Sequence, residues 1–394
     1  MRRALRDRLV LVVLIDALGH RIVREHGAFD FLGGGTHPIT SVCGYSSACM
    51  PSLLTGRLPV EHGHWAMFLR DPERSVFRRF RFLIRVLSDR LGRHGFTRRV
   101  IHRALQRRIR GYFNLYEVPP ALLPHFDLCE KEYLFGPRAL PPFETPFDVA
   151  ARLGVPWRSY AWETSEENRR GALLGDLRRG DCGFLFYYSP LLDAVMHAYG
   201  TRGESTRRCL RDLEVFLREA LVVAGRSYRE VRLVVFGDHG MADVHAAHQI
   251  FPVLRELDLR VPGECLPFVD STMARFWYFR PGVRERVETR LSALPYGRVL
   301  TDAECERLGI LFPDRRYGET VFLADGGEVL VPSFMGLTVP AGMHGYHPEH
   351  VDSATTLLTN FEPPEIRSIL EIGPWLSREI AALAPGGAGG GDGA

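Results

Sequence analysis

The stretch Leu9-Val10-Leu11-Val12-Val13-Leu14-Ile15-Asp16 holds seven apolar residues, most of them β-branched, and ends on a carboxylate. A run of this length and composition is typical of a β-strand that is buried on both faces, as in a parallel sheet. Residues 183–188 and 231–236 have the same character, and residues 205–224 between them carry apolar side chains at helical spacing. Strands that alternate with such helices predict an α/β fold, with a mostly parallel sheet sandwiched by helices.

The composition excludes several classes of protein. The chain has 394 residues, 45% of them hydrophobic and 25% charged, which is enough for a large core. Because 50 Lys and Arg residues nearly balance 47 Asp and Glu residues, no nucleic acid is expected as a partner. No stretch approaches the roughly 20 apolar residues of a membrane span, so no membrane partner is expected either. Seven cysteines without a CxxC pair favour a cytoplasmic location.

The pattern along the chain predicts one catalytic domain over residues 1–384. An insertion at about 66–150, rich in arginine and then in proline, would cover this domain like a cap. We expect a smaller α+β subdomain at about 260–335. The Gly-rich tail 385–394 has no core-forming residues and is expected to be disordered.

The insertion has two parts of different composition. Residues 70–110 contain fourteen arginines and predict an arginine-coated helix that packs on the body. The apolar stripe of this helix would consist of Phe80, Ile84, Leu87 and Leu91. The Pro-rich stretch 119–146 predicts a connection without regular structure.

Carboxylates follow all three predicted strands. Asp16 ends the first strand, Asp238 and His239 follow the third after one glycine, and Asp193 lies five residues beyond the second. Because ligands of open parallel sheets bind outside the carboxyl ends of the strands, we expect these side chains to converge on one edge. Charged groups so close to buried strands must be paired or bound to metal.

Histidines complete this set of candidate metal ligands. His197 follows Asp193 by four residues, so both lie on one face if the segment is helical, and His344 stands in Gly342-Met343-His344-Gly345-Tyr346. Three Asp and three His suit two zinc-like ions, and the absence of a thiolate argues against a structural zinc site. Other histidines could replace one of these ligands, His347 first among them; they are His245, His248, His347 and His350.

A candidate nucleophile lies in Gly44-Tyr45-Ser46-Ser47-Ala48-Cys49-Met50-Pro51. A serine at the start of a helix is exposed to free backbone N–H groups and to the positive end of the helix dipole. Both favour a deprotonated oxygen and a bound phosphate. Ser46 and Ser47 both fit this description.

Together these motifs resemble the alkaline phosphatase superfamily, in particular its type I nucleotide pyrophosphatase/phosphodiesterase branch. The matching segments occur in the order of that branch, from residue 9 to about residue 360. They are Leu14-Ile15-Asp16, Leu54-Thr55-Gly56-Arg57-Leu58-Pro59, His62-Gly63, Asp193 with His197, Gly237-Asp238-His239-Gly240-Met241, Asp270-Ser271-Thr272-Met273 and His344-Gly345-Tyr346.

The resemblance also implies a role for each candidate residue. Counting back from the Thr-Gly segment and from His-Gly places the nucleophile of the family on Ser46. One metal ion would then be held by four residues, which are Asp16, Asp238, His239 and Ser46 through its hydroxyl oxygen. The second ion would be held by Asp193, His197 and His344.

Three departures from the family pattern bear on the substrate. A serine, Ser46, replaces the usual threonine. Met67 stands where phosphodiesterases place a phosphate-contacting asparagine, and because a thioether cannot donate a hydrogen bond, we expect another contact, from His64 or an arginine. Ala48 and Met50 replace the proline and arginine of the sulfatase signature, which argues against a sulfatase.

The function implied is a two-metal hydrolase of phosphate esters, a phosphodiesterase or nucleotide pyrophosphatase that acts through a phosphoseryl intermediate on a nucleotide-like small molecule. The two divalent ions are expected to be zinc by ligand type, with manganese as the alternative. A phosphomonoesterase of a phosphorylated metabolite is the alternative function. A mutase of the same superfamily and a nucleic-acid-binding protein that uses the arginines rank below these. The sequence does not indicate an oligomeric state.

Overall fold

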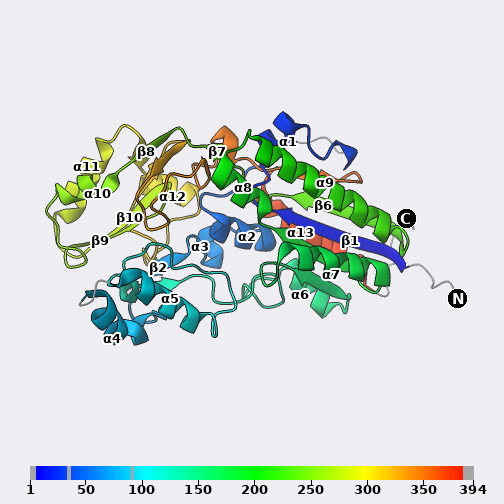
Figure 1. Ribbon diagram of the computed structural model, residues 1–394, viewed down its shortest axis with the longest axis horizontal. Helices are drawn as coiled ribbons and strands as arrows, with labels where there is room; N and C mark the ends of the chain where they lie inside the picture. Colours follow the sequence, from blue (N-terminus) through cyan, green and yellow to red (C-terminus); the bar gives the residue numbers. More distant parts are fainter. Residues whose placement is uncertain (1–5, 33–36, 90–92, 385–394) are drawn as a thin grey trace, which may run out of the picture.

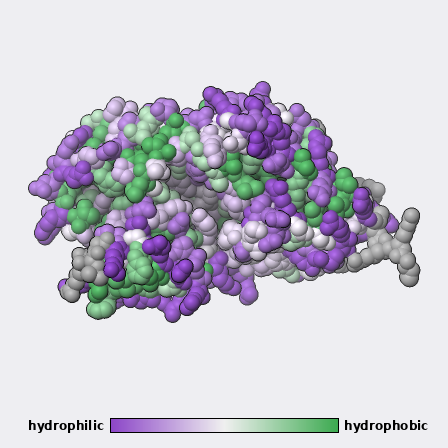
Figure 2. All heavy atoms as spheres, viewed as in Figure 1, coloured by the Kyte–Doolittle hydropathy of each residue, from purple (hydrophilic) through white to green (hydrophobic). Residues whose placement is uncertain are grey.

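The computed structural model of the protein describes residues 6–32, 37–89 and 93–384 (Figure 1). The tail 385–394 and Leu91 of the predicted stripe lie outside the described residues. No helix in the described part of the chain is long and apolar enough to cross a membrane. Hydrophilic side chains cover much of the face in Figure 2, with apolar residues in scattered patches.

The central sheet contains all three strands that the sequence predicts. Its strands lie in the order β15-β6-β1-β5-β4, and every neighbouring pair is parallel except β15 with β6. Their bounds are β1 Arg6–Ile15, β4 Trp157–Tyr160, β5 Phe184–Ser189, β6 Tyr228–Phe236 and β15 Leu357–Thr359. The expected mixed α/β fold with a mostly parallel sheet is therefore confirmed.

Both faces of this sheet are buried, which explains the unbroken apolar runs. On β1, Val10, Val12 and Leu14 belong to one core, whereas the alternate residues from Leu9 to Ile15 belong to the other. The first core is covered by α2 (Ser46–Thr55), α6 (Pro146–Arg152) and α13 (Ile369–Ala381). The second is covered by α1 (His20–His26), α7 (Glu166–Arg179), α8 (Leu191–Tyr199) and α9 (Glu204–Ala224).

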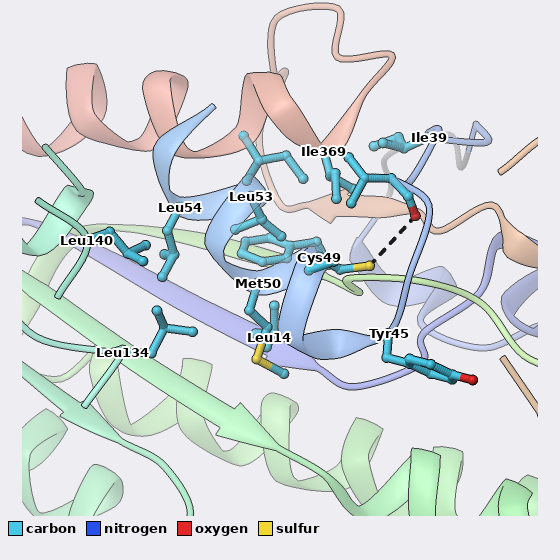
Figure 3. Close-up of a cluster of buried hydrophobic side chains, with 14 of the residues drawn as sticks. Leu14, Ile39, Tyr45, Cys49, Met50, Leu53, Leu54, Leu134, Leu140 and Ile369 are labelled. Carbon is cyan, nitrogen blue, oxygen red and sulfur yellow. Dashed lines mark hydrogen bonds between the residues drawn. The ribbon is translucent and has the colours of Figure 1, made fainter. Parts of the chain in front are cut away.

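Helix α2 lies between β1 and α13 in the first core (Figure 3). Leu53 and Leu54 point into the apolar cluster with Leu14 and Ile369 around them. Tyr45, directly before the helix, belongs to the same cluster. The buried face of α2 therefore fixes the helix and leaves its first turn at the carboxyl end of the sheet.

A second, antiparallel sheet has the order β11-β12-β10-β9 and packs against α10 and α11. The bounds are β9 Cys265–Val269, β10 Met273–Tyr278, β11 Gly297–Val299, β12 Thr320–Ala324, α10 Ile250–Arg255, α11 Val283–Ser292 and α12 Asp302–Arg307. Two short strand pairs, β13-β8 and β14-β7, lie in the chain segments between the two sheets. Their bounds are β7 Ala242–Asp243, β8 Ala246–His248, β13 Glu328–Leu330 and β14 Gly342–Met343.

The insertion differs from the predicted single helix. Strands β2 (Phe68–Arg70) and β3 (Phe126–Leu128) pair, and between them lie α4 (Arg81–Ile84), a π-helical turn Arg85–Asp89 and α5 (His94–Leu105). Separate helices allow Ile84 of α4 and the stripe on α5 to enter one aromatic core, which a single straight helix could not do. The stretch 119–146 was wrongly expected to lack regular structure, because buried β3 lies within it.

A buried ion pair links the second sheet to the insertion. Arg275 on β10 is fully buried and donates from Nε to Asp270 Oδ2 at 2.9 Å and from Nη1 to the carbonyl of Phe68 at 2.8 Å. Burial raises the pKa of Asp270, and the charge of Arg275 opposes this effect. The pair therefore stabilises the fold only while both partners are present.

Replacing Arg275 by methionine should leave the Asp270 carboxylate buried without a partner. We expect Arg275→Met to lower the free energy of unfolding by about 3–5 kcal/mol. Arg290→Met, which breaks the exposed Arg290–Glu256 pair on the surface, is the matched control and should cost about 1 kcal/mol or less. Urea unfolding followed by circular dichroism measures both, and equal losses would contradict the assignment.

Candidate active site

The carboxyl ends of β1, β5 and β6 bring the predicted acidic residues together. Asp16 directly follows β1, and Asp238 and His239 follow β6 after one glycine. Helix α8 begins two residues after β5 and carries Asp193 and His197. His344 directly follows the short strand β14. The structure thus places all six predicted Asp and His ligands at one edge of the sheet.

The first group consists of Asp16, Asp238 and His239, whose ligand atoms all lie within 4.8 Å of one another. His239 Nε2 is 3.2 Å from Asp238 Oδ2 and 3.5 Å from Asp16 Oδ1. Both of these carboxylate oxygens are buried and have no hydrogen-bond partner in the described structure. Buried carboxylate oxygens aimed at an imidazole nitrogen are the donor set that a divalent ion requires.

The second group consists of Asp193, His197 and His344, again within 4.8 Å of one another. Asp193 Oδ1 is 3.2 Å from His197 Nε2 and 3.5 Å from His344 Nε2, and it too is buried without a hydrogen-bond donor among the described residues. Residues 193 and 197 lie one turn apart on α8, as their spacing predicts. These residues fit a second metal ion.

The two groups are adjacent, since the rings of His239 and His344 stack with 3.9 Å between their centroids. Burial, followed by the charges of Asp238 and Asp193, raises the pKa of Asp16 well above its usual value. Burial also raises the pKa of Asp238 and lowers that of His344. The cluster therefore needs cations to hold three ionised carboxylates side by side, and His344 is kept neutral as a nitrogen ligand must be.

Neighbouring groups orient the ligands. Tyr188, the fifth residue of β5, donates from its hydroxyl to Asp16 Oδ2 at 2.5 Å. The backbone N–H of Ala17 donates to Asp238 Oδ1 at 3.2 Å, from a residue with φ of 59°. The Nδ1 atoms of His197 and His239 lie 2.8 and 2.9 Å from the carbonyls of Gly342 and Gly240. These contacts leave the other carboxylate oxygens and both Nε2 atoms for the metal ions.

Thr272 supports the turn that carries His344. Its N–H donates to the Tyr45 hydroxyl at 3.0 Å, and its own hydroxyl donates to the carbonyl of Gly345 at 3.1 Å. The ring of Tyr45 meets the His344 ring edge-on, with centroids 5.5 Å apart. Gly345 has φ of 88°, and a Cβ there would lie 2.6 Å from the Tyr45 ring, so only glycine fits.

Tyr188, Tyr45 and the Ala17 N–H were missed by the sequence reasoning. A tyrosine near the end of an otherwise apolar buried strand needs a partner for its hydroxyl, and this signal could have identified Tyr188. The motif Asp270-Ser271-Thr272-Met273 already indicated the region of Thr272. No sequence pattern indicated the contact of Ala17.

The structure separates the two candidate serines. Ser46 is the first residue of α2, and its hydroxyl oxygen lies 3.0 Å from His239 Nε2 in the first ligand group. The Ser47 hydroxyl instead donates to the carbonyl of Trp65 at 3.4 Å. Both serines lie in the first turn of α2, at the positive end of the helix, but of the two only Ser46 contacts the ligand groups.

The two predicted substrate contacts differ in their surroundings. The His64 backbone N–H donates to His62 Nδ1 at 3.2 Å, whereas its side-chain Nδ1 is buried without a hydrogen-bond partner among the described residues, and burial lowers the pKa of this side chain to about 4. Met67 Sδ accepts the N–H of Asn114 at 3.3 Å. Neither residue forms a hydrogen bond to one of the proposed metal-ligand residues in the part of the chain that the structure describes.

The other histidines do not join the two ligand groups, as far as the described residues show. His245 and His248 lie 3.1 and 2.5 Å from the two carboxylate oxygens of Glu328. His350 Nδ1 accepts the N–H of Asp352. His347 Nδ1 faces Glu349 at 3.8 Å.

Comparison with known proteins identifies the family of the chain. The model of the type I phosphodiesterase / nucleotide pyrophosphatase family matches residues 33–277. The chain belongs to this family. It is therefore a metal-dependent phosphoric ester hydrolase of the alkaline phosphatase superfamily. No curated protein sequence matches the chain.

Solved structures of phosphodiesterases share the fold. Murine ectonucleotide pyrophosphatase/phosphodiesterase 5 superposes with a TM-score of 0.68 at 16% identity, covering 97% of this chain and 98% of that one. An inactive variant of the murine protein in complex with AMP gives the same score and identity, with 98% of both chains covered. The human protein gives 0.66 at 14% identity and 95% coverage of both chains.

Removing one ligand of this phosphodiesterase should empty one metal position. We expect zinc-loaded wild-type protein to hold about two ions per chain, and Asp238→Ala or His344→Ala about one, because each variant damages only one group. His245→Ala, which removes a half-exposed imidazole paired with Glu328, is the matched control and should keep both ions. Plasma mass spectrometry measures the ratio; full zinc in either ligand variant would mean that the ligand set is wrong.

Proposed function

We propose that the protein is a two-metal phosphodiesterase or nucleotide pyrophosphatase in which Ser46 forms a phosphoseryl intermediate. The observation that carries this proposal is the Ser46 hydroxyl, 3.0 Å from His239 Nε2 at the first turn of α2. A nucleotide-like substrate is supported by the structural relative that was solved with AMP. The family match supports phosphodiesterase chemistry.

In this proposal Asp16, Asp238, His239 and the Ser46 oxygen hold one ion, and Asp193, His197 and His344 hold the other. When bound, the ions supply positive charge that favours a deprotonated nucleophile and stabilises the oxygens of the reacting phosphate. The hydroxyl oxygen of Ser46 attacks phosphorus, and the bond from phosphorus to the leaving oxygen breaks. Free N–H groups in the first turn of α2 stabilise the phosphate oxygens.

The second half of the reaction regenerates the serine. Water attacks the phosphoseryl phosphorus from the side that the leaving group vacated, and the bond to the Ser46 oxygen breaks. Ser46 takes up a proton, and the phosphate carries the new oxygen. Tyr188 and the Ala17 N–H keep Asp16 and Asp238 in place through both steps.

A diester or pyrophosphate fits the surroundings better than a monoester. The dianionic phosphate of a monoester needs extra positive contacts, for which His64 or an arginine is the candidate. Because burial lowers the pKa of His64 to about 4, its side chain is neutral at pH 7. Among the described residues, no lysine or arginine pairs with Asp16, Asp193 or Asp238 either.

Zinc is the proposed metal, since three imidazoles and three carboxylates form the two groups, and manganese is the alternative. We also propose a cytoplasmic location. All seven cysteines are free, and six of them are buried in the fold. This is the usage expected where thiols stay reduced.

Ser46→Ala should abolish turnover without loss of metal. We expect the rate on bis-p-nitrophenyl phosphate to fall by about 10³-fold or more, as for other covalent nucleophiles. Ser47→Ala is the matched control, because its hydroxyl contacts the Trp65 carbonyl, and it should keep most of the activity. Zinc content determined on the same samples separates loss of the nucleophile from loss of the site.

The same assay decides the substrate class. Wild-type protein should hydrolyse bis-p-nitrophenyl phosphate faster than p-nitrophenyl phosphate, since both esters have the same leaving group. A preference for the monoester would make the protein a phosphatase. Undiminished turnover in Ser46→Ala would assign the nucleophile to another residue.

A further inference from the structure

The insertion carries more positive charge on its surface than its ion pairs neutralise. Residues 70–110 contain fourteen arginines and three acidic residues. Arg98 pairs with Glu117, and Arg110 pairs with Glu132. Several exposed arginines form neither an ion pair nor a side-chain hydrogen bond with any described residue; they are Arg81, Arg85, Arg99, Arg103 and Arg107. Their charges are therefore available to an anionic partner.

On α5 the arginines share the outer face of the helix. Ile101 and Leu105 are buried in the aromatic core of the insertion. Arg99 and Arg103 are exposed and lie one turn apart on the opposite side. Phe96, one turn before Arg99, lies on the same outer side and is 47% exposed. The face of α5 that points away from the core is thus basic and carries one aromatic ring.

The segment that begins with α4 has the same arrangement. Ile84 is buried in the same aromatic core as Ile101. Arg81 and Arg85 are exposed and four residues apart, and Phe82 between them is 81% exposed. Because a phenylalanine ring in water is unfavourable, burial against a partner would stabilise it. The outer side of this segment therefore combines positive charge with an aromatic ring that the protein itself does not bury.

Helices α4 and α5 are held together as one unit. The backbone N–H of Arg93, directly before α5, donates at 2.8 Å to the carbonyl of Leu87 in the π-helical turn that follows α4. Both helices cover the same core from outside. Helix α4 lies at an outer corner of the molecule (Figure 1), where Figure 2 shows apolar side chains beside hydrophilic ones. The five arginines, Phe82 and Phe96 are called the basic surface below.

The chemistry of the basic surface fits the surface of an anionic membrane. Lipid phosphates attract guanidinium groups, and aromatic rings enter the boundary between headgroups and acyl chains. Docking of this kind needs no helix that crosses the bilayer. Proteins that bind single-stranded nucleic acid instead use a groove that follows the strand, whereas these side chains stand on the outer faces of two helices. The exposed rings therefore favour a lipid surface over a nucleic acid.

We propose that the basic surface docks the protein on an anionic membrane surface, with its arginines at the lipid phosphates and the rings of Phe82 and Phe96 in the interface. This partner agrees with the cytoplasmic location proposed above, since the cytoplasmic leaflet carries the anionic lipids. The proposal does not depend on the reaction at the metal-ligand groups. It adds a place in the cell where that reaction would occur.

The test measures co-sedimentation of the zinc-loaded full chain with lipid vesicles. Wild-type protein should bind vesicles of phosphatidylcholine with about one third phosphatidylserine, and should bind pure phosphatidylcholine much more weakly. Arg99→Gln combined with Arg103→Gln should weaken binding to the anionic vesicles by about 25-fold, or about 5-fold for each arginine. The matched control combines Arg207→Gln with Arg211→Gln, two exposed arginines one turn apart on α9, and should bind like wild-type protein.

A second pair of variants tests the aromatic part of the basic surface. Phe82→Ser should weaken binding to the anionic vesicles by about 10-fold, because the ring then no longer leaves water for the interface. Val215→Ser, which replaces an apolar side chain that is 65% exposed on α9, is the matched control and should not change binding. Since all the substituted residues are exposed, circular dichroism should give the wild-type unfolding temperature for each variant.

Three outcomes would overturn the proposal: wild-type protein that does not bind the anionic vesicles, equal binding to both kinds of vesicle, and equal losses in the α9 controls. Wild-type protein that binds a fluorescent single-stranded oligonucleotide in place of the vesicles would assign the basic surface to nucleic acid instead. Hydrolysis of the nitrophenyl esters is a separate measurement, so failure of the proposed reaction would leave the vesicle result in force.

Discussion

The central constraint on this structure is the repulsion among three carboxylates that lie side by side at a buried position. Asp16, Asp193 and Asp238 each keep one oxygen that is buried and without a hydrogen-bond donor in the described residues. Such oxygens are costly unless a cation faces them. Tyr188 and the Ala17 N–H hold the second oxygens of Asp16 and Asp238, and the free oxygen of each of the three carboxylates is left for a metal ion.

The parallel sheet is what makes the constraint possible. Because β1, β5 and β6 are buried on both faces, their carboxyl ends are fixed, and the residues that follow them meet at one edge. The left-handed residue Ala17 turns its N–H toward Asp238, and Tyr188 reaches Asp16 from the neighbouring strand. Residues of the strand ends that are not metal ligands thus orient the ligands.

The sequence was sufficient to predict what depends on pattern and spacing. The apolar runs predicted the three central strands, and the four-residue spacing of Asp193 and His197 predicted their shared helical face. It could not predict what depends on three-dimensional packing. Instead of the single helix expected within residues 70–110, the described structure has α4 and α5, because apolar residues of both helices enter one aromatic core. The contacts of Ser46 and Tyr188 depend on side-chain directions that residue types do not specify.

The most direct test of the two-metal arrangement is anomalous diffraction at the zinc edge from crystals of the zinc-loaded protein. The account predicts two peaks, one among Asp16, Asp238 and His239 and the other among Asp193, His197 and His344. A single peak, or a peak at Glu328 with His245 and His248 in place of either, would contradict it.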